Sequence, residues 1–263
     1  FVNDTNRRLA RFFESVRYSD FAIRFSSGKE KGDSFAEVNR QFNEVLEAFR
    51  PAVVSFHFGL PSAELLARVK AMGCRVVSSA TTVAEALWLE QHGVDGIVAQ
   101  GLEAGGHRGM FLTQALGTQL GTLALVPQIM AAVQVPVIAA GGIADAAGVR
   151  AAMALGAAGV QVGTAYLCCP EASTSAVHRA ALQSAAARHT ELTTLLSGRP
   201  ARGIVNRLMA SLGPLNPAAP AFPLATAAVA LLQAPARGSA PVTEPTAALP
   251  WLLTSEWAWA TAG

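Results

Sequence analysis

One histidine stands in a setting suited to chemistry, within the stretch 98-VAQGLEAGGHRGMF-111. His107 follows two consecutive glycines, with Glu103 four residues upstream and Arg108 next to it. Glycine permits backbone conformations and close approaches that a β-carbon would block, so the main chain here can lie against a flat or anionic group. Histidine is neutral or cationic near physiological pH, which suits it to accept a proton or to stabilise a developing anion. His107 is therefore the predicted catalytic residue.

The charged neighbours of His107 have two interpretations each. Glu103 either orients the imidazole or sits solvated in the loop, and Arg108 either attracts an anionic substrate or is solvated. A second histidine, His57 in VVSFHFG, projects from an expected strand. It either lines the same cavity as His107 or is a structural residue at the strand end. The residue types alone leave these alternatives open.

Glycines also end two later segments, 138-IAAGGIADAAGV-149 and 160-VQVGTAYL-167. Each places glycine at the end of an expected parallel strand, just before a helix, so backbone N–H groups there are free to bind an anion. In (β/α)₈ barrels a phosphate is often bound between the loops after strands 7 and 8 and an adjacent helix N-terminus. The alternative is that these glycines only make tight turns. The predicted phosphate-binding residues are Gly141, Gly142, Gly163 and Thr164.

The elements that must position these residues follow a βα pattern. From residue 35 onward, short β-branched runs alternate with longer amphipathic stretches, which is typical of βα units around a parallel sheet. The expected strands cover residues 53–59, 75–81, 96–101, 136–142 and 159–164. The expected helices cover residues 36–50, 62–73, 82–93, 123–133 and 145–156.

The polar residues fall at the ends of the strands, which favours a TIM (β/α)₈ barrel, where active sites collect at the carboxyl ends of the strands. A closed barrel needs eight strands, and the sequence offers five clear ones and a doubtful sixth, 21-FAIRF-25. Either the chain lacks its first two or three β/α units, or the sheet is an open doubly wound one; we favour the barrel. The pattern turns helical after residue 165, so we expect a partial barrel over 1–170 and a helical, loop-rich C-terminal region over 171–263, packed on the barrel.

Composition indicates a globular protein. The chain has 263 residues, of which 51% are hydrophobic, enough for one large core or two modest ones. The formal charge of +2 and the scattered basic residues argue against nucleic acid or a membrane surface as partner. The N-terminus lacks a signal-peptide pattern, and no run reaches the ~18 apolar residues of a membrane span. The three cysteines have no metal-ligand spacing, so we expect no metal and a cytoplasmic location.

Five segments together resemble one known family. VVSFHFGLP, GLEAGGHRGMF, PVIAAGGIAD, ALGAAGVQVGTAYL and SGRPARGIVNRLM are similar to the motifs of the nitronate monooxygenases, formerly called 2-nitropropane dioxygenases, which are FMN-dependent TIM barrels. The similarity runs through most of residues 50–209. The family's first strand, which carries further flavin contacts, has no counterpart in the sequence. The C-terminal segment 251–263 only loosely resembles the family's aromatic ending.

This resemblance implies a cofactor and roles for particular residues. FMN would be held noncovalently at the mouth of the 1–170 barrel, its phosphate on the glycines already named, and His107 would be the catalytic residue. The segment 197-SGRPAR-202 would tie the C-terminal region to the barrel. Further residues expected close to the flavin are Gln100, Gly101 and Ser79.

The activity that the resemblance implies is oxidation of alkyl nitronates by molecular oxygen to carbonyl compounds and nitrite. The partners are then a small nitronate and oxygen. A homodimer is compatible with the barrel class, although no apolar stripe marks an interface. Two alternatives remain: a flavin-dependent enoyl-acyl carrier protein reductase that uses NAD(P)H, and a degenerate fragment without catalytic activity.

Overall fold

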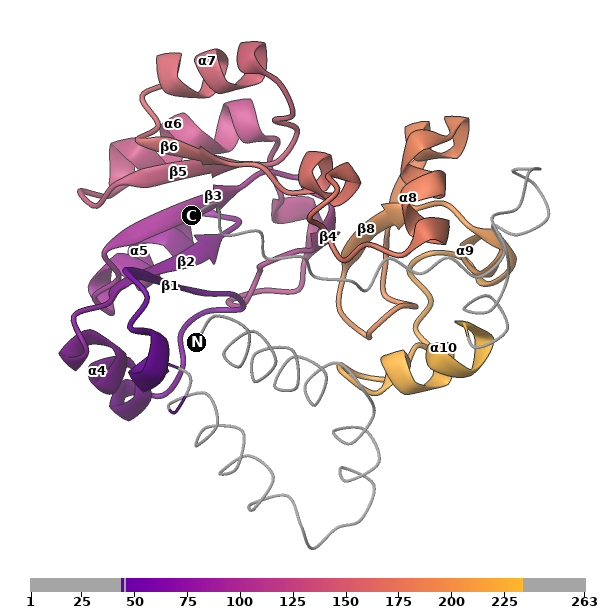
Figure 1. Cartoon of the computed structure of the whole chain (residues 1–263), viewed down its shortest axis with the longest axis horizontal. Coiled ribbons are helices and arrows are strands. Elements are labelled where there is room, and N and C mark those ends of the chain that lie inside the picture. The colour runs from indigo at the N-terminus through magenta and orange to yellow at the C-terminus, as the bar shows by residue number, and fades with distance from the viewer. Residues whose placement is uncertain (1–43, 45, 234–263) are drawn as a thin grey trace, which may run out of the picture. The chain divides into compact units, whose positions relative to one another are not determined.

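The computed structural model describes residues 44 and 46–233 of the chain (Figure 1). The chain divides into two compact units, one made of Phe1–Val54 and Ala63–Cys74, the other of Ser55–Ser62 and Arg75–Gly263. Each unit is described by itself. All of the predicted site residues belong to the second unit.

Five parallel strands form the main sheet. Its order is β1-β2-β3-β5-β6, with β1 at Val53–Phe56, β2 at Arg75–Ala80 and β3 at Gly96–Gln100. The last two strands are β5 at Val137–Ala140 and β6 at Gly159–Gln161. All five lie within the predicted strands, each one to three residues shorter at the carboxyl end.

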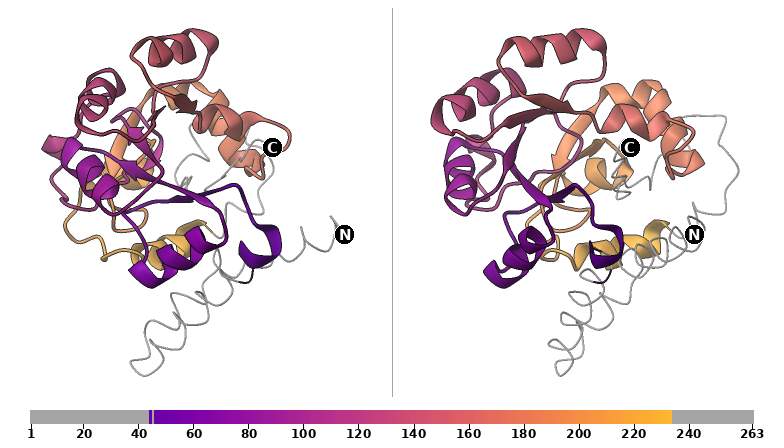
Figure 2. Two further views of the ribbon diagram at one scale, coloured as in Figure 1. Left: turned by 90° about the vertical axis from the view of Figure 1, so that its left-hand side faces the viewer. Right: turned by 60° about the vertical axis from the view of Figure 1, so that its left-hand side comes forward.

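The strand order distinguishes the two predicted architectures. Strands follow one another across the sheet in the order of the sequence, whereas a doubly wound sheet reverses its order part-way. Because βαβ crossovers are right-handed, a sheet that never reverses carries its helices on one side. Figure 2 shows this arrangement, with the strands curling and the connecting helices along their outer side. The barrel prediction is confirmed, and the doubly wound alternative is wrong.

Three helices connect the central strands. Helix α5 (Val83–Gln91) packs on β2 and β3, α6 (Thr122–Ala132) on β3 and β5, and α7 (Ala146–Ala154) on β6. The side chain of Thr82 caps α5 by accepting from the backbone N–H of Glu85, and Asp145 caps α7 in the same way through Gly148. Both caps supply an acceptor to N–H groups that have no partner within the helix.

The core lies between the sheet and these helices. All five residues of β3 are buried, as expected for a parallel strand that is covered on both faces. Its apolar side chains lie in the same core as Leu89 of α5 and Ile129 of α6, which are fully buried. The central strand is therefore the rigid support from which the His107 loop departs.

A second, antiparallel sheet was not predicted. Its order is β4-β8-β7, formed by β4 (Gly106–His107), β7 (Thr190–Thr193) and β8 (Ala201–Ile204). The strands are only two to four residues long, and β4 joins its partner across about ninety residues of sequence, so no local pattern marks them. The remaining elements after β6 are η2 (Thr164–Cys168), α8 (Ala176–Gln183), η3 (Ala185–Arg188), α9 (Arg207–Leu212) and α10 (Ala225–Gln233); η1 (Leu116–Thr118) precedes α6.

The first unit contributes α4 (Ala63–Ala71) and helical residues 46–49. Arg68 of α4 forms an exposed ion pair with Glu47 at 3.3 Å. The predicted segments 21–25 and 251–263, and most of helix 36–50, lie outside the described residues. In the described part of the chain no helix has the length and apolar character needed to cross a membrane. The domain boundary proposed near residue 170 stays a prediction.

Candidate active site

The predicted site residues follow three adjacent strands of the main sheet. Gln100 of β3 lies beside Ala140 of β5, and Ala140 lies beside Gln161 of β6. These three residues form one row across the sheet, and all three strands run in the same direction. The loops that follow them therefore leave from the same edge. The His107 loop and the two glycine turns are brought together as the sequence predicted.

These loops approach one another closely. A β-carbon on Gly105 would lie 2.7 Å from the hydroxyl oxygen of Thr164, so the His107 loop touches the start of η2. A β-carbon on Gly142 would lie 3.3 Å from the β-carbon of Glu103. The glycines thus allow a close approach that larger residues would prevent.

We use the name glycine rim for Gly141, Gly142, Gly163 and Thr164. Gly141 and Gly142 have φ of +110° and +69°, a left-handed backbone that favours glycine. Gly142, Gly163 and Thr164 are exposed, and a β-carbon on Gly163 would meet nothing within 4 Å. Within the described residues, the backbone N–H groups of Gly142 and Gly163 make no hydrogen bond. Donors that face open space are what a phosphate requires.

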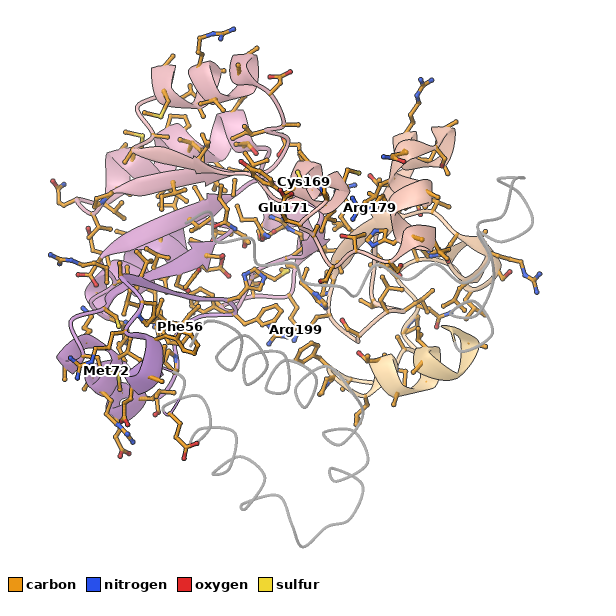
Figure 3. The ribbon with its side chains drawn as sticks, in the orientation of Figure 1. Phe56, Met72, Cys169, Glu171, Arg179 and Arg199 are labelled. Carbon is orange, nitrogen blue, oxygen red and sulfur yellow. The ribbon has the colours of Figure 1, made fainter. Side chains whose placement is uncertain are left out.

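A side chain of α8 holds the segment that follows η2 in place. The guanidinium of Arg179 donates to the carbonyl oxygens of Cys169 at 2.8 Å and Ala172 at 3.1 Å (Figure 3). The end of the 3₁₀ turn that begins at the glycine rim is thereby anchored. The rim keeps its backbone exposed without losing its position.

The amide side chain of Gln100 holds the His107 loop at both ends. Its Nε2 donates to the carbonyl oxygen of His107 at 3.0 Å, and its Oε1 accepts from the backbone N–H of Gly109 at 2.7 Å. The next residue, Gly101, is buried, and a β-carbon there would overlap Thr122. Both residues shape the loop. Their role as flavin contacts stays a prediction.

Arg108 is a structural residue, which corrects both interpretations of it as a loop cation. Its side chain is fully buried. The guanidinium donates to the carbonyls of Gly101 at 2.7 Å and Gln100 at 2.8 Å, and to Oε1 of Gln119 at 3.0 Å. Burial, with a smaller effect of nearby Arg202, lowers the pKa of Arg108 to about 10, although two carboxylates oppose the shift. Arg108 remains charged at neutral pH and holds the loop closed.

Glu103 likewise has a structural partner. Its carboxylate accepts from the backbone N–H of Thr122 at 2.9 Å and from the Thr122 hydroxyl at 2.9 Å. Helix α6 begins at this residue, and its own N-cap, Gly121, offers no side-chain acceptor. An acidic side chain at a helix N-terminus is favourable because of the helix dipole. Glu103 therefore caps α6, and it is not the group that orients His107.

His107 is positioned by the second sheet. Its backbone pairs with Ala201 of β8, and its Nε2 shares a hydrogen bond of 2.5 Å with Oγ of Ser197. The residue is 7% exposed. The partner that fixes the imidazole thus comes from a segment ninety positions later in the chain.

His57 lies in the same site. Its Nδ1 shares a hydrogen bond of 3.0 Å with Oγ of Ser79, at the end of β2. Burial lowers the pKa of His57 to about 4, although a hydrogen bond to the backbone of His107 opposes this shift. Burial, together with smaller effects of His57 and Arg199, lowers the pKa of His107 to about 4 as well. Both imidazoles are therefore neutral at neutral pH.

Aromatic rings and one guanidinium complete the surroundings of His107. The rings of Phe58 and Phe222 meet the imidazole edge-on, with centroids 5.8 Å and 5.9 Å away. The guanidinium of Arg199, labelled in Figure 3, lies 4.3 Å from the centroid of the Phe58 ring and 5.5 Å from that of Phe222. The histidine cluster, as we name it, consists of His57, Phe58, His107, Ser197, Arg199 and Phe222.

Three members of this cluster were missed as site residues. Ser197 and Arg199 belong to the SGRPAR segment, which was interpreted only as structural, and Phe222 was not singled out. The one available signal was the SGRPAR motif itself. Within the described residues no group of three or more His, Cys, Asp or Glu side chains is placed to hold a metal ion.

Comparison with known proteins shows the family of the chain. A family model described as nitronate monooxygenase matches residues 15–244, which is most of the chain. The chain belongs to the nitronate monooxygenase family. A nitronate monooxygenase of Paraburkholderia phytofirmans is 48% identical over 189 residues, which are 72% of this chain and 52% of that protein. Its Pseudomonas aeruginosa counterpart is 48% identical over 193 residues, 72% of this chain and 55% of that protein.

A solved structure also resembles the chain. The nitroalkane oxidase of Streptomyces ansochromogenes superposes with a TM-score of 0.70 at 38% identity, covering 76% of this chain and 58% of that one. The chain spans about half the length of the curated family members that it matches. Its family and its TIM-barrel fold class are thereby established.

Proposed function

We propose that the protein uses FMN to oxidise alkyl nitronates with molecular oxygen, giving carbonyl compounds and nitrite. The observation that carries this proposal is the common edge shared by the three loops. The glycine rim and the His107 loop leave from adjacent parallel strands, so a nucleotide held by the rim would have His107 near its reactive end. Family membership supports the same activity.

The residues present are compatible with FMN. The rim offers exposed backbone N–H groups and open space at Gly163, which suit a phosphate. When bound, FMN would supply the one-electron chemistry with oxygen that side chains cannot perform. The chain would contribute binding, orientation and a dry environment for the substrate carbon.

His107 acts in this proposal as a neutral group of fixed orientation. Its hydrogen bond to Ser197 and its pairing with β8 hold the ring in one position. A nitronate is already deprotonated at carbon, so the demand on the site is to place the anion rather than to remove a proton. For a neutral nitroalkane, the unprotonated imidazole is the group that can accept the proton.

The test is the visible spectrum of the purified protein together with oxygen uptake. We expect a yellow protein, or one that becomes yellow on addition of FMN, and oxygen consumption that depends on a nitronate. Fast bleaching by NADH with no response to nitronates would instead support the enoyl-acyl carrier protein reductase. A protein that stays colourless with added FMN would support the non-catalytic alternative and contradict the proposal.

A further inference from the structure

Arg199 is a half-buried cation for which the structure gives no acidic partner. Among the residues that the structure describes, no carboxylate forms an ion pair with it. The guanidinium has a single hydrogen bond there, from Nη1 to the carbonyl oxygen of Met110 at 3.4 Å. A charge taken out of water is usually paired, because desolvation is costly. Within the described part of the chain, the remaining donors of this guanidinium have no protein acceptor, and we assign them to a ligand.

The other positive groups near His107 cannot take this role. The guanidinium of Arg108 is fully buried and donates to three protein oxygens. Arg202 donates to the carbonyl oxygen of Leu102 at 3.0 Å and to Thr190 at 3.2 Å. The two imidazoles are neutral at neutral pH. Arg199 is thus the source of positive charge in the histidine cluster.

The setting of Arg199 also restricts the shape of a ligand. Its guanidinium lies over the Phe58 ring and near that of Phe222, and such contacts hold a guanidinium flat against an aromatic face. A planar guanidinium presents a rigid fork of donors that matches two oxygens on one atom. The nitro group of a nitronate has this geometry and carries a full negative charge. A neutral nitroalkane has the oxygens without the charge.

We propose that Arg199 is the specificity-determining residue of the site, binding the two oxygens of a planar anion so that ionised nitronates are preferred over neutral nitroalkanes. The proposal rests on the proposed function and adds the residue that selects the ionisation state of the substrate. His107 then faces the carbon end of the substrate, and Arg199 holds the nitro end.

The test compares Arg199→Met and Arg199→Lys with the wild-type protein, using propyl-2-nitronate and neutral 2-nitropropane. Loss of a charge-assisted hydrogen bond should raise KM for the nitronate in Arg199→Met by about 10- to 100-fold. The KM for 2-nitropropane should change by less than about threefold, because its neutral nitro group has no negative charge for the guanidinium to pair with. Arg199→Lys keeps the charge without the forked donors, so its KM for the nitronate should lie between the values of the wild-type protein and Arg199→Met. The matched control is Arg150→Met, at an exposed position of α7, which should leave both substrates unchanged.

Binding of nitrate, a planar anion, gives a second readout by calorimetry that needs no turnover. Wild-type protein should bind nitrate and Arg199→Met should not, with equal FMN content in both. An equal rise in KM for both substrates, or loss of FMN from Arg199→Met, would overturn the inference. The residue would then stabilise the fold or bind the cofactor instead of selecting the substrate. If wild-type protein binds nitrate through Arg199 yet oxidises no nitronate, the proposed function fails while the anion site stands. If nitronate is oxidised equally well by Arg199→Met, the inference alone fails.

Discussion

The histidine cluster and the glycine rim lie at one edge of the same sheet but differ in burial and in the groups that they present. In the cluster His107 is buried, and its surrounding loop is held by the side chains of Gln100 and Arg108. In the rim most of the backbone is exposed, and three of the four residues are glycines, which have no side chain to interfere. Orientation of a reactive ring requires many side-chain contacts, whereas binding of a phosphate requires free main chain. Substitutions should therefore act on chemistry in one region and on cofactor affinity in the other.

The largest effect should come from His107→Ala. If His107 acts on the substrate, turnover should fall by about 10²- to 10⁴-fold, the usual contribution of a positioned acid or base. The rim would be intact, so the variant should still bind FMN. Steady-state oxygen uptake with a nitronate, at equal flavin content, measures the change. Turnover equal to that of wild type would remove His107 from the mechanism and leave the rim as the only functional region.

Arg108→Met tests whether the cluster depends on a buried scaffold. The substitution leaves two backbone carbonyls and the Gln119 amide without their donor, so the free energy of unfolding should fall by about 3 to 5 kcal/mol. Urea unfolding gives the value. The exposed control Arg150→Met should change it by less than about 0.5 kcal/mol. A loss as small as the control's would show that the loop closes without this clamp.

The pH dependence of stability should reflect the lowered pKa values in the histidine cluster. The pKa of His107 is about 4 in the folded chain and about 6.5 for a solvated histidine of the unfolded chain, so between these limits the unfolded chain binds more protons. The free energy of unfolding should therefore be highest above pH 6.5 and fall as the pH is lowered toward 4. The loss is about 1.4 kcal/mol for each unit by which the two pKa values differ. His107→Asn, followed by urea unfolding at several pH values, should reduce this slope without abolishing it, because the pKa of His57 is also lowered to about 4. An unchanged slope would mean that the ring is solvated.

How far the sequence predicts each region depends on the sequence separation of the residues that are in contact there. The strands and the rim were predicted because β-branched runs and terminal glycines are local signals, and parallel strands bring their ends together. The partners of His107 were not predictable from spacing, because Ser197 reaches it from ninety residues away through a three-stranded sheet of very short strands. The structural roles of Glu103 and Arg108 were not predictable for the same reason. Their partners, Thr122 and Gln119, are set by tertiary packing rather than by the neighbouring sequence.

The smallest effect should come from Gly163→Ala, which should change the affinity for FMN without changing stability. It therefore separates the rim from the cluster most sharply. The position has a negative φ of −108° and open space around the added methyl group, so the free energy of unfolding should change by less than about 0.5 kcal/mol. The Kd for FMN should nevertheless rise about tenfold, or about 1.4 kcal/mol, because the methyl group occupies the space that the phosphate needs. Gly117→Ala, equally open but in η1, is the matched control and should leave the Kd unchanged. Fluorescence titration with FMN measures both. Tight binding by the Gly163 variant would mean that the rim only turns the chain, and that the cofactor is held by the cluster instead.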